Sequence, residues 1–254
     1  MNESVCLFDV FSCFSIVIPV LNEEDNIFSL VREIGKQLQG QRGFEVVVVD
    51  DHSTDKTAAV LAQLRKDFSW LRTIRLSMQS GQSAALWYGI WKARYPVIVT
   101  MDGDGQNDPM DIGKLLNVYQ ELSRKSSCCL VNGNRVKRKD SGWRRFSSLL
   151  ANTIRRRLLQ DDTPDSGCGI KAFSRETFLS LPSFSHMHRF LPALVRQKGG
   201  VVVSVAVRHR ARTSGSSHYG TLDRLRAGIL DLMGVSWLGK RAIGQGLIEE
   251  ETNA

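Results

Sequence analysis

The first half of the chain alternates short apolar segments with longer segments of helical periodicity, and this order restricts the fold more than any other feature. The apolar segments are residues 15–19, 44–49, 71–76 and 96–101, and the helical ones are 23–39, 53–66, 80–93 and one that opens at Asp108-Pro109. Residues 44–49 (FEVVVV) are too uniformly apolar for a strand with one solvated face, so this strand is predicted to be buried on both faces. Ser53 or Thr54 would cap the second helix. Strand–helix alternation predicts an α/β fold with a mostly parallel sheet, right-handed crossovers and flanking helices.

The second half of the chain is less regular. Its predicted elements are a strand at 128–132, a basic helix at 143–159, a turn and short strand at 165–173, a strand at 201–207 and a helix at 221–238. No internal repeat or low-complexity linker divides the chain. We therefore expect an N-terminal extension at 1–13, one α/β domain at 14–220, and an amphipathic basic helix with a polar tail at 221–254.

Charge is distributed unevenly along the chain. Residues 1–132 hold 13 Lys/Arg and 16 Asp/Glu, a net charge of −3, whereas residues 133–254 hold 21 and 10, a net charge of +11. A basic second half favours an anionic partner for that half, which could be nucleic acid, a phosphate group or an acidic membrane surface.

The cysteines and the apolar runs bear on the compartment. None of the five cysteines forms a Cys-x-x-Cys pair and their number is odd, so neither a zinc site nor a disulfide framework is indicated. A reducing, cytosolic compartment fits this pattern. The first apolar stretch lacks a preceding basic region and contains Asp9, which argues against a secretory signal. No run reaches the roughly 18–20 apolar residues of a membrane span, so we expect a soluble or peripheral protein.

The clearest candidate for chemistry follows the fourth apolar segment, where residues 102–106 read Asp-Gly-Asp-Gly-Gln. Asp102 and Asp104, one residue apart on a turn that glycine loosens, can converge on one hard divalent cation, and Gln106 adds a neutral oxygen. Such a site leaves room for water and substrate phosphates. The simpler alternative is a polar turn of solvated acids. An EF-hand is disfavoured because its last glutamate ligand is missing.

Other polar clusters also follow predicted strands. Asp50-Asp51 follows a strand, at the position of the acidic residue that binds a ribose in nucleotide-binding sheets. The alternative is an ordinary turn and helix cap. The Gly-x-Gly-x-x-Gly pattern of dinucleotide sites is absent. Asn22-Glu23-Glu24 could bind a ligand or start a helix, and residues 80–83 offer backbone donors that suit a phosphate. Ligands of parallel sheets bind at the carboxyl ends of the strands, and the motifs around Asn22, Asp51 and Asp102 all fall at such ends.

Taken in order, the polar motifs of the chain form a set. They read Ser-Ile-Val-Ile-Pro19-x-x-Asn-Glu-Glu, Val-Val-Asp50-Asp51-x-Ser-x-Asp-x-Thr57, Gly81-Gln-Ser-Ala-Ala-Leu86, Met-Asp102-Gly-Asp-Gly-Gln-Asn-Asp-Pro109, Gly133-Asn-Arg135, Asp165-Ser-Gly-Cys-Gly-Ile-Lys171 and His209-x-x-Arg-x-x-Gly-x-Ser-x-Tyr219. This set resembles the family 2 glycosyltransferases, whose Rossmann-like fold is called GT-A. The similarity is greatest to the branch that glycosylates polyprenyl phosphates, the dolichyl-phosphate mannose synthase type, and it covers roughly residues 14–240.

The resemblance implies roles for the matched residues. The residues that would line the nucleotide-sugar donor are Pro19, Leu21, Glu23, Asp51, Gly81, Gln82 and Asp102. Mg²⁺ or Mn²⁺ on the donor diphosphate would be held by Asp102, Asp104 and Gln106. Arg135, Arg145 and Arg212 would face the acceptor phosphate or the diphosphate, and Asp165 would lie near the reacting sugar. Leu21 stands where the family often has a tyrosine that stacks on the base, and His218 where it usually has lysine or asparagine.

The implied reaction is an inverting transfer of a sugar from GDP-mannose or a UDP-sugar to dolichyl or undecaprenyl phosphate at the cytoplasmic face of a membrane. A phosphate acceptor is already largely ionised at neutral pH, so Asp165 would orient or assist more than deprotonate. In and just after the helix at 221–238, Arg224, Arg226, Lys240 and Arg241 flank a set of apolar residues, an arrangement that suits an anionic membrane interface. The alternative role of this helix is packing onto the domain.

Three other functions compete with this one. A family 2 enzyme with a soluble glycan or protein acceptor is the runner-up. A nucleotidyltransferase would need a P-loop-like signature near the first strand, which is absent. A nucleic-acid binder would leave the acidic strand ends unexplained and would need aromatic residues among the arginines, so nucleic acid is not an expected partner.

His186 and His188 lack an acidic or thiol partner nearby in sequence, so a metal site there is not expected. Residues 155–157 are expected to form a solvated basic face. The sugar, the base and the oligomeric state are open.

Overall fold

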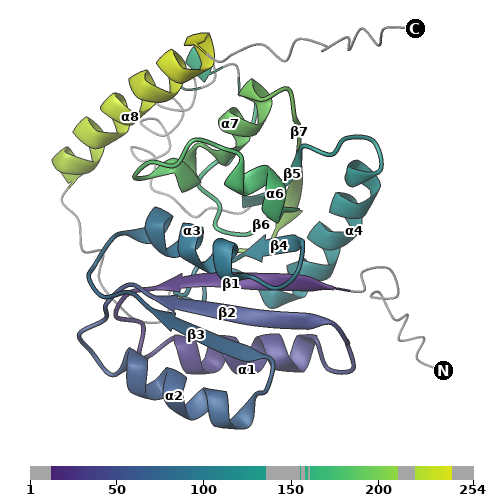
Figure 1. Cartoon of the computed structure of the whole chain (residues 1–254), viewed down its shortest axis with the longest axis vertical. Helices are drawn as coiled ribbons and strands as arrows, with labels where there is room; N and C mark the ends of the chain where they lie inside the picture. Colours follow the sequence, from purple (N-terminus) through teal and green to yellow (C-terminus); the bar gives the residue numbers. More distant parts are fainter. Residues whose placement is uncertain (1–12, 136–154, 156–157, 160, 211–220, 242–254) are drawn as a thin grey trace, which may run out of the picture.

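Strand β1 (Phe14–Val20) lies inside a seven-stranded sheet and is hydrogen-bonded to β2 on one side and to β4 on the other (Figure 1). The other strands are β2 (Phe44–Asp50), β3 (Leu71–Arg75), β4 (Val97–Thr100), β5 (Cys129–Arg135), β6 (Lys171–Ser174) and β7 (Val201–Val207), in the order β3-β2-β1-β4-β6-β5-β7. The computed structural model describes residues 13–135, 155, 158–159, 161–210 and 221–241.

The first four strands run parallel to one another, as the alternating pattern predicts. β6 departs from this arrangement, because it is antiparallel to both β4 and β5, whereas β5 and β7 are parallel. The sheet is therefore mostly parallel, and the three strands predicted in the second half, at 128–132, within 165–173 and at 201–207, belong to it as β5, β6 and β7. The two halves of the chain share one sheet.

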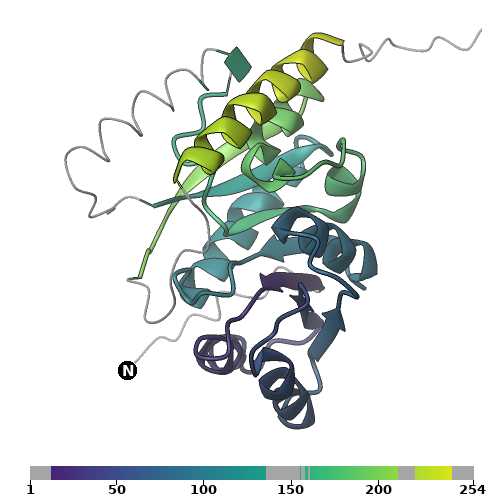
Figure 2. The ribbon, with the colours of Figure 1, turned by 90° about the vertical axis from the view of Figure 1, so that its left-hand side faces the viewer.

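Helices cover both faces of the sheet and form two cores. The first core holds α1 (Ile27–Gln37), α2 (Thr57–Asp67) and α4 (Ile112–Ser123), and the second holds α3 (Gln82–Lys92), α6 (Arg175–Leu179) and α7 (Leu191–Gln197). β1 serves both, because Ile16 and Ile18 point into the first and Val17 into the second. Short helices η1 (Pro109–Asp111) and η2 (Met187–Arg189) adjoin these layers, and α8 (Thr221–Arg241) runs along the outside of the part that carries α7 (Figure 2).

The expected cap of the second helix is wrong. Helix α2 begins at Thr57, so neither Ser53 nor Thr54 caps it. Ser53 instead accepts a hydrogen bond from the backbone N–H of Asn22, at 2.9 Å, which keeps it in the loop before the helix. The predicted opening of the fourth helix is confirmed, since the Asp108 carboxylate accepts from the N–H of Met110 and η1 begins at Pro109.

Arg155 also differs from the expected solvated basic face. Its side chain is buried and forms an ion pair with the fully buried Asp161, and it donates a second hydrogen bond to the carbonyl of Thr163. Burial of a guanidinium requires such pairing. Most of the predicted helix at 143–159 lies outside the described residues.

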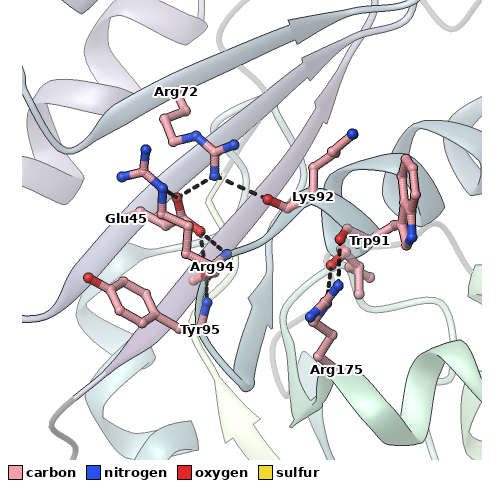
Figure 3. A network of polar contacts seen from close by, with 9 residues as sticks. Glu45, Arg72, Trp91, Lys92, Arg94, Tyr95 and Arg175 are labelled. Atoms are coloured by element: carbon pink, nitrogen blue, oxygen red, sulfur yellow. Dashed lines mark hydrogen bonds and ion pairs between the residues drawn. The ribbon is translucent and has the colours of Figure 1, made fainter.

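The amino-terminal ends of β1 and β2 are joined by a polar network around the buried carboxylate of Glu45 (Figure 3). Oε1 of Glu45 accepts from the Ser15 hydroxyl at 2.8 Å and from the N–H of Arg94 at 2.6 Å, and Oε2 accepts from Arg72 at 2.7 Å. Arg72 and Arg175 also donate to carbonyls in the last turn of α3. This network holds α3 against the end of the sheet opposite the strand ends that bear the motifs.

We expect Glu45→Ala to lower the free energy of unfolding by about 2 kcal/mol, because it leaves buried donors without an acceptor. The matched control is Arg72→Met, which removes a partly exposed partner and keeps Glu45 hydrogen-bonded to Ser15 and Arg94; its expected loss is about 1 kcal/mol or less. Urea denaturation measures both. A smaller loss in Glu45→Ala than in Arg72→Met would contradict a central role for the carboxylate.

Candidate active site at the carboxyl ends of β1, β2 and β4

The three motif-bearing loops lie side by side, because β2, β1 and β4 are neighbours and run in the same direction. The loop after β1 and the loop after β2 are directly joined. Backbone N–H groups of Asn22 and Glu23 donate to the hydroxyls of Ser53 and Thr57, each at 2.9 Å, and the N–H of Thr54 donates to the Asn22 side chain at 2.8 Å. The motif around Asn22 and the motif that follows Asp51 therefore hold each other in place.

Asp51 fixes a third segment to these two. Its side chain is buried, and its two carboxylate oxygens accept from the N–H groups of Ser80 and Gly81, at 2.7 and 2.8 Å. These two N–H groups are thereby occupied, which contradicts the prediction that the backbone donors of Ser80 and Gly81 are free for a phosphate. Asp51 sets the position at which α3 begins, at Gln82.

The acidic loop is held from both sides. The backbone N–H of Asp102 donates to the buried side chain of Asn107 at 2.8 Å, and Gln82 donates to the Asp102 carboxylate at 3.0 Å. Gly105 has a φ of +71°, a conformation that the turn requires and that other residues adopt reluctantly. Removal from water raises the pKa of Asp102 to about 6, and the neighbouring charge of Asp104 adds to this effect.

This repulsion is informative about a metal ion. A divalent cation would offset the negative charge of Asp104 that raises the pKa of Asp102, and carboxylate oxygens are the donors that Mg²⁺ and Mn²⁺ prefer. In the described ranges, no three His, Cys, Asp or Glu side chains gather as a complete ligand set. Asp102 and Asp104 thus fit a metal that takes its remaining ligands from water and phosphate oxygens. The backbone N–H of Gln106 donates to Asp104 at 3.1 Å, which places Gln106 beside this pair.

Arg135 and Asp165 form a two-point ion pair beside the acidic loop. Nε and Nη2 of Arg135 donate to the two carboxylate oxygens of Asp165, at 2.6 and 2.7 Å. Burial opposes ionisation of Asp165, but the hydrogen bonds and charge of Arg135 outweigh it and keep the pKa of this carboxyl below its usual range. The pair raises the pKa of Arg135 as well, so both groups stay charged.

Lys171 is a site residue whose role the sequence pattern did not indicate. It starts β6, its side chain is buried, and its ammonium donates to the carbonyls of Ser166 and Cys168. Burial lowers the pKa of Lys171, while the charges of Asp102 and Asp165 act in the opposite direction. Lys171 therefore stabilises the loop that follows Asp165, and its charge acts on Asp102 in the acidic loop. The available signal was its place at the end of the Asp165-Ser-Gly-Cys-Gly-Ile-Lys171 motif.

His188 also lies close to the site. Its Nδ1 is 2.8 Å from the hydroxyl of Ser83, in the first turn of α3 beside Gln82, and burial lowers the pKa of His188 to about 3. His186 has an acidic partner after all, because its Nδ1 lies 2.9 Å from the carboxylate of Asp231 in α8. The sequence did not indicate this pair, because the two residues are 45 positions apart.

The end of β7 approaches the acidic loop from the other side. The N–H of Arg210 donates to the carbonyl of Gln106 at 3.0 Å, and its guanidinium bridges Asp108 and Glu33. Residue 210 is therefore anchored beside the predicted metal site, at the point where the segment with Arg212 begins. Arg145, Arg212 and His218 lie outside the described residues.

Comparisons with known proteins agree with this geometry. A model of the family described as "Glycosyl transferase family 2" matches residues 15–181, more than half of the chain. The chain belongs to glycosyl transferase family 2. The matched range contains Asp51, the acidic loop, Arg135, Asp165 and Lys171.

The names of two curated relatives of the chain include a polyprenyl phosphate. A dodecaprenyl-phosphate galacturonate synthase of Rhizobium johnstonii is 38% identical over 232 residues, which cover 87% of this chain and 65% of that protein. An undecaprenyl-phosphate 4-deoxy-4-formamido-L-arabinose transferase of Pseudomonas aeruginosa is 32% identical over 213 residues, which cover 83% of this chain and 61% of that protein. The chain spans less than two thirds of the length of these two relatives.

Solved structures confirm the predicted GT-A fold of this family 2 member. Glucosyl-3-phosphoglycerate synthase of Mycobacterium tuberculosis with Mg²⁺ and UDP superposes with a TM-score of 0.63 at 21% identity, and covers 92% of this chain and 81% of that chain. The same enzyme with Mn²⁺, UDP-glucose and phosphoglyceric acid gives a TM-score of 0.60 at 23% identity, with the same two coverages. This likeness is evidence for the fold.

We expect Gly169→Ala to disturb the predicted metal site, because a Cβ at this position would lie 2.0 Å from Oδ2 of Asp102. Displacement of the carboxylate should weaken Mn²⁺-dependent binding of UDP or GDP by about tenfold or more, which corresponds to about 1.4 kcal/mol. Titration calorimetry at several Mn²⁺ concentrations measures this change.

The control is Gly167→Ala in the same loop, where the nearest atom to a new Cβ is Nη2 of Arg135 at 3.8 Å, an ordinary contact. Thermal unfolding checks that both variants fold. An equal metal dependence in the two variants would contradict the assignment of Asp102 to the metal.

Proposed function

We propose that the chain is the catalytic part of a metal-dependent, inverting glycosyltransferase that moves a sugar from a nucleotide-sugar to a polyprenyl phosphate. Membership of family 2 supports the sugar transfer. The names of the two relatives, which both include a long-chain polyprenyl phosphate, support the acceptor class.

The observation that carries the acceptor proposal is the state of Asp165. Both of its carboxylate oxygens accept hydrogen bonds from Arg135, and its pKa is held low, so it is a weak general base. A hydroxyl acceptor has to lose a proton during transfer. A phosphate monoester is already ionised, because its second pKa is about 6. An engaged Asp165 therefore fits a phosphate acceptor, and its role would be to orient Arg135.

Cations on the acceptor side support the same assignment. Arg135 is the last residue of β5, and the charges of Arg135 and of the buried Lys171 both act on Asp102 in the acidic loop. Arg145 and Arg212 are proposed to contribute further charge, in line with the net charge of +11 for residues 133–254. Positive groups at this side would attract an anionic acceptor and hold it for an in-line attack on the anomeric carbon.

The donor would bind along the ends of β1, β2 and β4. The residues proposed to line the base and ribose are Pro19, Leu21, Glu23 and Asp51, and Gly81 and Gln82 would border the diphosphate. Asp102, Asp104 and Gln106 would hold Mg²⁺ or Mn²⁺, which supplies neutralising charge to the leaving diphosphate. Gln82, Asn107 and Lys171 would keep these ligands in place, since each contacts the acidic loop or the segment beside it.

The acceptor lipid places the reaction at a membrane surface, and the nucleotide-sugar places it on the cytoplasmic face. None of the helices in the described part of the chain combines the length and apolar composition needed to cross a bilayer. We propose that this part of the chain works at the surface of the membrane, with α8 as the element nearest to the lipid.

The acceptor class is tested by nucleotide release from GDP-mannose, UDP-glucose, UDP-N-acetylglucosamine, UDP-aminoarabinose and UDP-galacturonate. Each donor is offered with undecaprenyl phosphate or with undecaprenol, which has the same chain and a hydroxyl head. We expect release with the phosphate alone, and only with Mg²⁺ or Mn²⁺ present. Transfer to undecaprenol or to a soluble glycan, with the phosphate inert, would overturn the proposal.

We expect Asp102→Asn and Asp104→Asn each to reduce transfer by about 10²-fold or more, because the metal stabilises the leaving group by several kcal/mol. Without metal, Asp102→Asn should unfold at the wild-type temperature or above it, because burial and the charge of Asp104 both disfavour the ionised Asp102 carboxylate. Asp67→Asn, at an exposed carboxylate on α2, is the matched control with full activity. Unchanged activity in either site variant would contradict the metal assignment.

A further inference from the structure

Helix α8 is attached to the domain by one face. Asp231, Val235 and Gly239 are spaced four residues apart and therefore share that face. Val235 is buried in the second core, and Asp231 pairs with His186. Gln197 of α7 donates to the carbonyl of Val235 at 3.1 Å, and its side chain crosses Gly239 so closely that a Cβ there would lie 2.6 Å from its Nε2. We call His186, Gln197 and these three α8 residues the seat.

The opposite face of α8 is apolar and exposed. Ile229, Met233 and Trp237 also repeat every four residues, and an offset of two residues turns them by about 200° from the seat. Their side chains are 51%, 63% and 60% exposed, and the adjacent Leu230 is 69% exposed. We call these four residues the stripe. A contiguous apolar row on the outside of a helix whose other face is already packed marks an interaction surface.

The charges of α8 indicate which partner fits the stripe. Among residues 228–241, the charged side chains are Asp231, Lys240 and Arg241, and Asp231 is engaged in the seat. Lys240 and Arg241 are exposed in the last turn, after the stripe. Apolar side chains that include a tryptophan, followed by cations, match an anionic phospholipid surface, in which the apolar groups enter the acyl boundary and the cations meet the head groups.

The seat also connects α8 to the candidate site. His186 and His188 belong to the same short segment, and His188 contacts Ser83, next to the Gln82 that donates to Asp102. One continuous set of contacts therefore runs from α8 to the acidic loop. Because α8 is attached at Asp231, Val235 and Gly239, the stripe has a fixed direction relative to the site.

We propose that α8 is a two-sided spacer: its stripe lies on an anionic phospholipid surface, and its seat sets the height and angle at which the active site faces that surface. The inference rests on the proposed transfer to a membrane-borne acceptor. The phosphate of such an acceptor is confined to the plane of the head groups, so a fixed angle raises the fraction of encounters that are productive. Loss of the seat then harms transfer at the membrane without preventing attachment.

Two variants of the full chain separate these roles. The seat variant carries Asp231→Ala and Gln197→Ala, and the stripe variant carries Ile229→Ser, Met233→Ser and Trp237→Ser. The control is Met78→Ser, which removes an equally exposed methionine (66%) far from α8 in the sequence. Each protein is assayed for flotation with phosphatidylglycerol–phosphatidylcholine vesicles, for transfer to undecaprenyl phosphate in those vesicles, and for transfer to a short, soluble polyprenyl phosphate.

The stripe variant should lose vesicle binding and, with it, transfer to the vesicle-borne acceptor. The seat variant should keep vesicle binding within about twofold and lose about tenfold or more of the transfer to the vesicle-borne acceptor. Both should use the soluble acceptor like the control, which also shows that they are folded.

Three results would overturn the spacer. They are vesicle binding by the stripe variant equal to that of wild type, normal transfer at vesicles by the seat variant, and a wild-type dimer in light scattering that the stripe substitutions dissociate. The last result would make the stripe a contact between copies of the chain. Failure of the wild type to use either acceptor, while the stripe still governs vesicle binding, would instead contradict the proposed function.

Discussion

The arrangement of the candidate site depends on the pairing of β1 with β2 and β4. Every residue of β1 is buried, and both of its edges are hydrogen-bonded to parallel partners. The three strands must therefore end at the same edge of the sheet. Polar groups that are distant in sequence meet there, and the hydrogen bonds of Asn22 and Asp51 fix the loops relative to one another. The sheet supplies the rigid base and the loops supply the chemistry.

Charge balance links this base to the proposed reaction. Asp102 and Asp104 oppose each other, and the neighbouring cations Arg135 and Lys171 counter part of this negative charge. A divalent cation would complete the balance and at the same time attract the donor diphosphate. Asp165 is excluded from a free basic role by its two hydrogen bonds to Arg135. This balance of charge supports the proposed binding of anions on both the donor and the acceptor side.

The agreement between prediction and structure is uneven for a physical reason. The strands and helices of the first half were predictable because burial repeats every two or every 3.6 residues along the chain. Ser53 was assigned to a helix cap, because a hydroxyl before a helix usually has that role, but it binds the loop of Asn22 instead. Arg155 was assigned to a solvated face and is buried against Asp161. The errors occur where a distant or hidden partner satisfies the polar group.

The sequence by itself determined the α/β class, the order of the strands along the chain and the edge at which the motifs collect, because these follow from local periodicity and from the direction of parallel strands. Only the tertiary structure decided that Asp165 is engaged by Arg135, 30 residues away, and that the charge of the buried Lys171 acts on Asp102. It also decided that the apolar residues of α8 divide between a packed face and an exposed one. These outcomes depend on which surfaces meet, and that information is absent from any single segment of the chain.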